Sequence, residues 1–166
     1  LWRYRLDGTP EEPVLPAADS VGYHAWLDRA RVALFVLGSP PTLRVADVDA
    51  GTDTVVATRI GRSIRAVPGR TAVSFVKVAP DSSTAVHIVE GDALTSRRLV
   101  ATPGAGTGDF HAWTPDGHLL MAAGGRLHAW HPDAPGWRVV AALDSMNVSR
   151  LAVSPAGTRL ALVAAE

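Results

Sequence analysis

The sequence predicts an all-β fold built from repeated four-stranded sheets, and three observations carry this prediction. Twelve Pro and 15 Gly are spread along the 166 residues, and they interrupt every candidate helix. Short runs of Val, Leu, Ala and Phe lie between Gly, Pro, Asp and Ser, which is typical of antiparallel strands. These runs also recur with a period of about 40 residues, which indicates a repeat architecture.

The predicted strands follow one another at short intervals along the chain. The runs that carry the prediction are 32–37, 43–48, 54–57, 72–78, 85–89, 98–101, 119–123, 126–130, 138–143 and 159–163. Runs of this length fit strands and are too short for the helices of a globular protein.

Four segments of the chain can be aligned as repeats, namely 23–35, 64–75, 110–121 and 150–162. Each contains an Ala in a short strand, then a turn, then an apolar strand. The Ala residues, at positions 25, 66, 112 and 152, are 41, 46 and 40 residues apart. This spacing, with four strands per unit, is typical of a β-propeller blade. The predicted blades are approximately 23–62, 63–108, 109–148, and 149–166 together with 1–22.

The two ends of the sequence each supply half of a blade. The last repeat ends after two strands, whereas residues 1–8 align with 127–133 and residues 13–15 align with the start of 138–143. We therefore expect the fourth blade to be built from both termini, within one chain or by dimerisation to eight blades, because this removes open sheet edges. The alternative is a boundary produced by cutting a longer chain inside a blade.

Packing and turn residues suit this architecture. A small Ala on each inner strand would let neighbouring blades approach at the crowded axis. Trp26 and Trp113 are large enough to fill the gaps between blade faces. Residues 114–117 and 154–157 combine Pro and Gly in the order that a tight hairpin requires.

The segments 113–120 (WTPDGHLL) and 153–160 (VSPAGTRL) resemble the W-S-P-D-G signature of TolB-like propeller repeats, and 1–8 resembles the strand that follows it. The resemblance covers essentially the whole chain and implies a β-propeller, usually of six blades, in a bacterial protein exported to the periplasm. The second repeat departs from the signature at 67–71. Because the motif consists of turn and packing residues, it carries little information about function.

Composition excludes several classes of function. Lys plus Arg and Asp plus Glu both number 16, which argues against binding nucleic acid or anionic membranes through bulk charge. The absence of Cys excludes disulfides, thiolate metal sites and Cys nucleophiles. No apolar run approaches the roughly 20 residues of a membrane span.

Candidate cofactor motifs have structural explanations. His24 and His111 share a repeat position, but other repeats have Arg65 and Leu151 there, which favours packing over metal binding. Residues 47–53 lack the bidentate acid of a calcium loop. Residues 104–108 are Gly-rich but precede a strand, whereas a phosphate loop precedes a helix. We therefore predict no cofactor and no metal.

Connections from the outermost strand of one blade to the innermost strand of the next are expected on one rim of the propeller. These connections are 17–22, 58–63, 102–109 and 144–149, and they bring a cluster of polar residues to the rim: Arg59, Arg62, Arg65, Asp109, Asn147 and Arg150. Arg favours bidentate contact with carboxylate or phosphate. The alternative is that these Arg pair with Asp19, Asp109 and Asp144.

These features favour a non-enzymatic scaffold that binds a protein or peptide on this rim. One alternative is an accessory propeller of a hydrolase or a lactonase-like metal-dependent enzyme, for which only Asp109 and Asn147 are suitably placed. Another is a structural or engineered propeller fragment without activity of its own. A homodimer through the half-blade edges is a further expectation.

Overall fold

The computed structural model describes residues 1–15, 18–104, 110–144 and 146–165. Within these ranges the chain consists of antiparallel strands and turns, arranged as three four-stranded sheets and two two-stranded sheets. The predicted all-β propeller fold is confirmed. In the same ranges, no helix has the length and apolar character needed to cross a membrane.

Each four-stranded sheet is a blade whose strands pair in chain order. The first contains β3 (Val21–Trp26), β4 (Arg31–Val36), β5 (Thr42–Asp47) and β6 (Thr52–Thr58). The second contains β7 (Ile60–Ala66), β8 (Ala72–Val78), β9 (Thr84–Glu90) and β10 (Thr95–Ala101). The third contains β11 (Ala112–Trp113), β12 (Leu119–Ala123), β13 (Arg126–Trp130) and β14 (Arg138–Ala142). The hairpins are β1 (Trp2–Tyr4) with β2 (Pro10–Pro13), and β15 (Asn147–Val153) with β16 (Leu160–Ala165).

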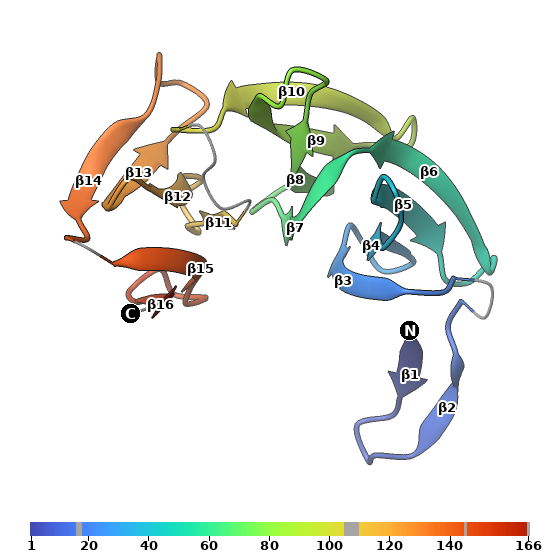
Figure 1. Cartoon of the computed structure of the whole chain (residues 1–166). Helices are drawn as coiled ribbons and strands as arrows, with labels where there is room; N and C mark the ends of the chain where they lie inside the picture. The colour runs from blue at the N-terminus through green and yellow to red at the C-terminus, as the bar shows by residue number, and fades with distance from the viewer. Residues whose placement is uncertain (16–17, 105–109, 145, 166) are drawn as a thin grey trace.

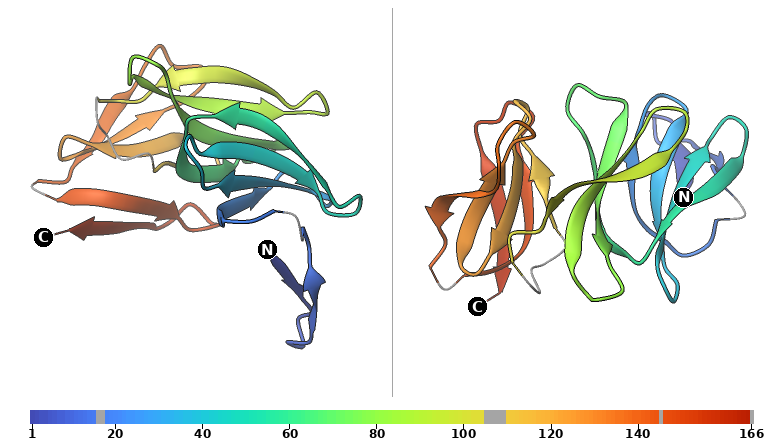
Figure 2. Two further views of the ribbon diagram at one scale, coloured as in Figure 1. Left: turned by 45° about the vertical axis from the view of Figure 1, so that its right-hand side comes forward. Right: turned by 90° about the horizontal axis from the view of Figure 1, so that it is seen from above.

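The blades follow one another along an open arc (Figure 1). Strands β3, β7, β11 and β15 lie on the inner side of this arc, and β6, β10 and β14 lie on its outer side. Seen from above, the sheets stand side by side with their faces toward each other (Figure 2). The repeated Ala positions all fall on the four inner strands, as the alignment predicts.

Apolar side chains fill the spaces between adjacent sheets. Phe35 and Leu43 of the first sheet pack with Phe75 of the second, and Val76 of the second sheet packs with Met121 of the third. Each of these side chains is at most 4% exposed. Burial of one such side chain stabilises the fold by about 1.5–3 kcal/mol, so the contacts between sheets hold the arc together.

The hairpin turns adopt the expected geometry. Gly117 and Gly157 have φ angles of +87° and +70°, which only Gly adopts without strain. The Thr114 N–H donates to the His118 carbonyl across the first of these turns, at 2.8 Å. The Pro-Asp-Gly segment 115–117 and the Pro-Ala-Gly segment 155–157 therefore act as structural turns.

Two expectations about packing are wrong in part. Ala112 is buried, as a residue between close blades should be, but Ala66 and Ala152 are exposed. Trp113 packs between the second and third sheets, whereas Trp26 is 47% exposed. The difference arises because Trp113 packs against the preceding sheet, whereas in the described part of the chain no preceding four-stranded sheet lies before the one that holds Trp26.

The fourth blade was expected to be completed within one chain or by dimerisation. The structure does not show completion within one chain. Among the described residues, β1 pairs with β2 alone and β15 pairs with β16 alone, so the two terminal hairpins form separate sheets. Both views place the two hairpins at opposite ends of the arc (Figures 1 and 2). The N-terminal hairpin instead precedes a segment whose Leu15 and Ala18 pack against the first sheet.

Candidate functional site

A pocket of about 120 Å³ lies among the inner strands. It is lined by Tyr23 and His24 of β3, by 62–65 of β7, by Phe110 just before β11, and by Arg150 of β15. Residues that are far apart in the sequence meet here because each blade contributes its innermost strand. None of the described lining residues is acidic.

Irregular pairing at the inner strands shapes this pocket. The register shifts between Val21 and Tyr23 on β3, between Ile60 and Ile64 on β7, and between Val148 and Arg150 on β15. Such bulges redirect side chains and are frequent beside functional sites. Arg62 and Arg65 are three residues apart and would lie on opposite faces of a regular strand. The irregularity in β7 lets both line the same pocket.

Arg65 is held in place between two blades. Its Nε donates to the backbone carbonyl of His111 at 3.0 Å. Burial lowers the pKa of the Arg65 guanidinium from its ordinary value, although Arg remains charged at any physiological pH. In the described part of the chain Arg65 forms no ion pair.

Arg150 lies against two aromatic rings. Its guanidinium carbon is 4.6 Å from the centroid of the Phe110 ring, and its terminal nitrogen donates to the Tyr23 hydroxyl at 3.5 Å. The Tyr23 and Phe110 rings meet edge to face, with centroids 6.4 Å apart. A cation over an aromatic face is stabilised by roughly 0.5–1 kcal/mol at an exposed site, so these contacts orient the guanidinium.

A buried polar cluster supports the pocket from behind. His111 is fully buried, and its Nε2 lies 2.7 Å from the Ser74 hydroxyl, which also accepts the indole N–H of Trp113 at 2.8 Å. The amide N–H of His111 donates to the hydroxyl of Ser63 at 3.2 Å. If Nε2 carries the ring proton of His111, it donates to the Ser74 hydroxyl oxygen, and the Ser74 hydroxyl donates in turn to the Arg65 carbonyl. In this tautomer every donor of the cluster has an acceptor. These bonds fix the second blade to the third.

His111 itself is electrically neutral in the folded chain. Burial, and secondarily the charge of Arg65, lowers its pKa from 6.5 to about 3. Its Nδ1 is buried without a hydrogen-bond partner among the described residues. The other ring nitrogen, Nε2, lies 2.7 Å from the Ser74 hydroxyl, so His111 takes part in the packing between the second and third blades.

The predicted rim residues do not all lie at one place. Arg62, Arg65 and Arg150 meet at the inner-strand pocket. Arg59 lies elsewhere, where its guanidinium donates to the carbonyls of Val78 and Ala79. Asn147 is exposed at the start of β15 and does not line the pocket. Asp109 lies outside the described residues.

Arg59 is separated from the others because the expected connection 58–63 is not a loop. Only Arg59 stands between β6 and β7, and residues 60–63 already belong to β7. The φ angle of Arg59 is +58°, so the chain reverses at this single residue. A rim loop was the wrong prediction here, because the segment pairs with β8.

Sequence reasoning missed the aromatic members of the pocket. Tyr23 and Phe110 each come directly before a His-Ala-Trp triplet, at equivalent positions of two repeats. This repeated aromatic-His-Ala-Trp pattern was the signal that could have identified them. Ser63 and Ile64 carried no such signal.

The other acidic and His residues of the described chain lie apart from one another or in turns. Among the described residues, no three His, Asp or Glu side chains lie close enough together to hold one metal ion. Asp47 caps the turn after β5, where its carboxylate accepts the N–H groups of Asp49 and Ala50 at 2.9 Å. The segment 47–53 is therefore a hairpin turn in which Asp47 is occupied by the backbone.

Comparison with known proteins supports the fold. No family model matches the sequence, and no curated protein matches it. TolB from Acinetobacter baumannii is similar in structure, with a TM-score of 0.70 at 18% identity over 97% of this chain and 42% of TolB. A chain of the nidogen/laminin complex matches with a TM-score of 0.63 at 16% identity, covering 90% of this chain and 58% of the other.

Two further solved structures differ in what they are said to do. YCF48 bound to D1 peptide matches with a TM-score of 0.53 at 14% identity, over 90% of this chain and 62% of the other. A protein proposed to be a gluconolactonase matches with a TM-score of 0.58 at 14% identity, over 92% and 60%. The chain thus spans between 42% and 62% of these proteins, and it shares with them a β-propeller fold like that of TolB.

Proposed function

We propose that this chain is a non-enzymatic β-propeller scaffold that binds a protein or peptide through the inner-strand pocket. The observation that carries the proposal is that Arg65 and Arg150 converge beside the Tyr23 and Phe110 rings, in a pocket that Arg62 also lines. A guanidinium matches a carboxylate in shape and charge and bonds to it bidentately. The proposed target is therefore a peptide segment that presents an Asp or Glu side chain.

The size and setting of the pocket favour a single side chain as the inserted group. A volume of about 120 Å³ accommodates one acidic side chain rather than a folded element. Arg65 is held by a backbone carbonyl, and Arg150 is held by Phe110 and Tyr23. Because these groups are already oriented, little conformational entropy is lost on binding.

The solved structures with this fold are compatible with such a role. The YCF48 structure contains a bound peptide, and the nidogen structure is a complex with laminin. These facts concern those proteins. They support the proposal only in that propellers of similar shape bind polypeptides.

Binding of immobilised peptide pools tests the proposal. One pool of octapeptides has a central Asp or Glu, and the matched pool has Asn or Gln there. We expect the acidic pool to bind more tightly, and Arg150→Gln to weaken that binding about ten-fold. Arg138→Gln is the matched control, because Arg138 is exposed on β14, away from the pocket. Equal binding of the two pools, or equal effects of the two variants, would refute the proposal.

The lactonase-like, metal-dependent alternative is favoured by one structural neighbour, the protein proposed to be a gluconolactonase. Elemental analysis of the purified chain separates the two functions. One tightly bound divalent ion per chain would favour the enzyme and count against the peptide scaffold.

We also propose that the two half-blades complete each other between two copies of the chain. The outer edge of β16 and one edge of β1 carry no partner strand among the described residues. Trp26 and His24 are exposed on one face of β3. The equivalent residues of the third sheet, Trp113 and His111, are covered by the second sheet. Strands β15 and β16 of a second copy would cover this face.

Solution mass tests this pairing. At high micromolar concentration we expect a particle of twice 17.4 kDa, and Trp26→Ala should shift it toward the monomer. The control is Val55→Ala, because Val55 is exposed on β6, away from the half-blade edges. Trp2→Ala is unsuitable as a control because β1 belongs to the edge that is tested. A monomer at all concentrations would contradict the pairing.

A further inference from the structure

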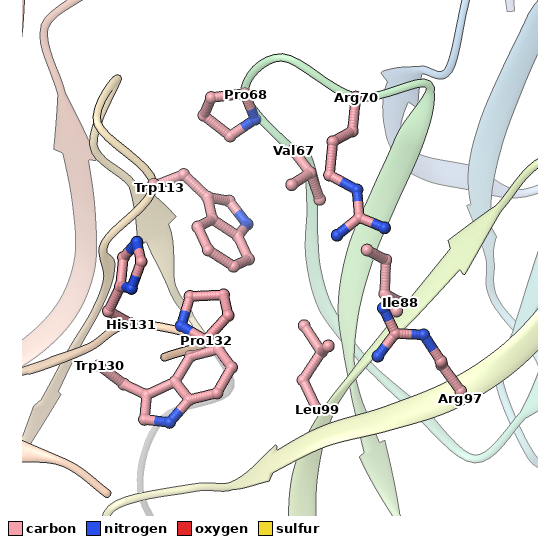
Figure 3. Close-up of a pocket in the computed structure, with 11 residues that line it drawn as sticks. Val67, Pro68, Arg70, Ile88, Arg97, Leu99, Trp113, Trp130, His131 and Pro132 are labelled. Carbon is pink, nitrogen blue, oxygen red and sulfur yellow. The ribbon is translucent and has the colours of Figure 1, made fainter. Parts of the chain in front are cut away.

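A second pocket, of about 260 Å³, opens between the second and third blades. One wall comes from the third blade and carries Trp113, Trp130 and Pro132. The other wall comes from the second blade and carries Val67, Ile88 and Leu99. Figure 3 shows the two walls facing each other across the opening. The walls are therefore mainly apolar, with two indole rings on one side.

The indole wall is rigid. The Trp113 indole N–H is fixed by the hydroxyl of Ser74 at 2.8 Å. Trp130 is only 6% exposed, and its ring lies 6.4 Å from that of Trp137. His131, next along the chain, lies with its ring 5.0 Å from that of His118. A flat ring entering the pocket would meet surfaces that do not need to rearrange.

Two cations stand at the second-blade side of the opening. Arg70 and Arg97 both extend toward Ile88, so that their guanidinium groups gather at one place (Figure 3). Both bind the carboxylate of Glu90. The Nε of Arg97 donates to one carboxylate oxygen at 3.1 Å, and Arg70 binds the other oxygen of the same carboxylate. One carboxylate thus faces two guanidinium groups, which leaves one net positive charge. Each guanidinium has five N–H donors, so donors remain for a further anion.

We propose that this cleft binds a small aromatic carboxylate, with the ring between the apolar walls and the carboxylate at Arg70 and Arg97. The volume lies just below the roughly 300–1,000 Å³ of sites for drug-sized ligands, which fits a molecule of one or two fused rings. Aromatic stacking on indole provides apolar contact, and the net charge selects the anion. This site is distinct from the inner-strand pocket and shares no lining residue with it.

The strand β10 offers a matched pair of variants. Arg97 pairs with Ile88 across the sheet and lines the cleft, whereas Arg98 pairs with His87 and lines a different pocket on the opposite face. Replacing Arg97 by Gln removes a charge from the cleft. The same change at Arg98 removes a charge from the same strand without touching the cleft.

Titration with 2-naphthoate, followed by the indole N–H signals in ¹H–¹⁵N NMR, tests the proposal. We expect 2-naphthoate to shift the Trp113 and Trp130 signals, and the neutral 2-naphthamide to bind about ten-fold more weakly. Arg97→Gln should weaken naphthoate binding about ten-fold, and Arg98→Gln should leave it unchanged. Leu99→Phe, which fills the cleft, should weaken both ligands.

Three results would overturn the proposal. The first is no shift of either indole signal at millimolar 2-naphthoate. The second is equal affinity for the acid and the amide. The third is an equal effect of the Arg97 and Arg98 variants. Because both Arg side chains are largely solvent-accessible, these variants keep the fold and the test remains decisive.

Discussion

Acidification should weaken the contact between the second and third blades through His111. Its pKa is lowered from 6.5 to about 3 in the folded chain, first by burial and then by the charge of Arg65. The unfolded chain therefore binds the proton at higher pH than the folded chain does. The stabilising contribution is complete above about pH 6.5 and is lost progressively as the pH falls toward 3.

The magnitude follows from the two pKa values. Between pH 7.5 and pH 5 the difference amounts to about 2 kcal/mol of unfolding free energy, a large share of the stability of a domain of this size. Burial and the charges of Lys77 and Arg98 also lower the pKa of His87, so His87 acts in the same direction. A variant that removes only the His111 side chain is needed to separate the contribution of His111 from that of His87.

Urea unfolding of the parent chain and of His111→Gln, at pH 7.5 and pH 5, makes this comparison. Gln cannot titrate, and its amide still reaches the hydroxyl of Ser74. We expect the parent to lose about 2 kcal/mol more than the variant on acidification, because the contribution of His87 cancels. The Cε1–H signal of His111 in the parent should also show no protonation at pH 5. An NMR midpoint near pH 6, or equal losses in both proteins, would refute the reasoning.

Four further substitutions test the packing and the turns. Gly125→Ala should lower the unfolding free energy by about 2–3 kcal/mol, because φ is +68° and the new Cβ would lie 2.5 Å from a backbone carbonyl oxygen. Gly124→Ala, with φ of +55° and open space around it, should cost only about 1 kcal/mol; thermal unfolding compares the two. Trp113→Phe removes the donor to Ser74 and should cost about 1–2 kcal/mol by urea titration. Leu119→Ala, at a fully buried position, should cost about 2–5 kcal/mol by the same method.

The strands and turns were predictable because they depend on local chemistry. The Pro-Asp-Gly turn that ends at Gly117 follows from the fixed φ of Pro and the positive φ of Gly, and the structure has that turn. The period of the repeat then predicted which strands are innermost, which are third and which are outermost in each blade. Repeats report on architecture because every blade must solve the same packing problem.

The composition of the pocket was only partly predictable, because side-chain direction depends on strand register. Alternation along a strand assigns Arg62 and Arg65 to opposite faces, but the irregular pairing of β7 brings both to the pocket. The sequence contains no mark of this bulge. Arg59 is separated from the other two for a different reason, namely that it is the single residue between β6 and β7 rather than part of a longer loop.

The two His residues of the aromatic-His-Ala-Trp repeats show what a repeat can and cannot specify. His24 and His111 occupy the same slot, yet His24 is exposed and His111 is fully buried beside Ser74. The slot belongs to one blade, but its surroundings belong to the preceding blade, which supplies Ser63, Arg65 and Ser74 for His111. The environment of His24 is thus set by whichever inner strands come to lie against β3, and burial of His24 and Trp26 together would report that a neighbouring half-blade has docked there.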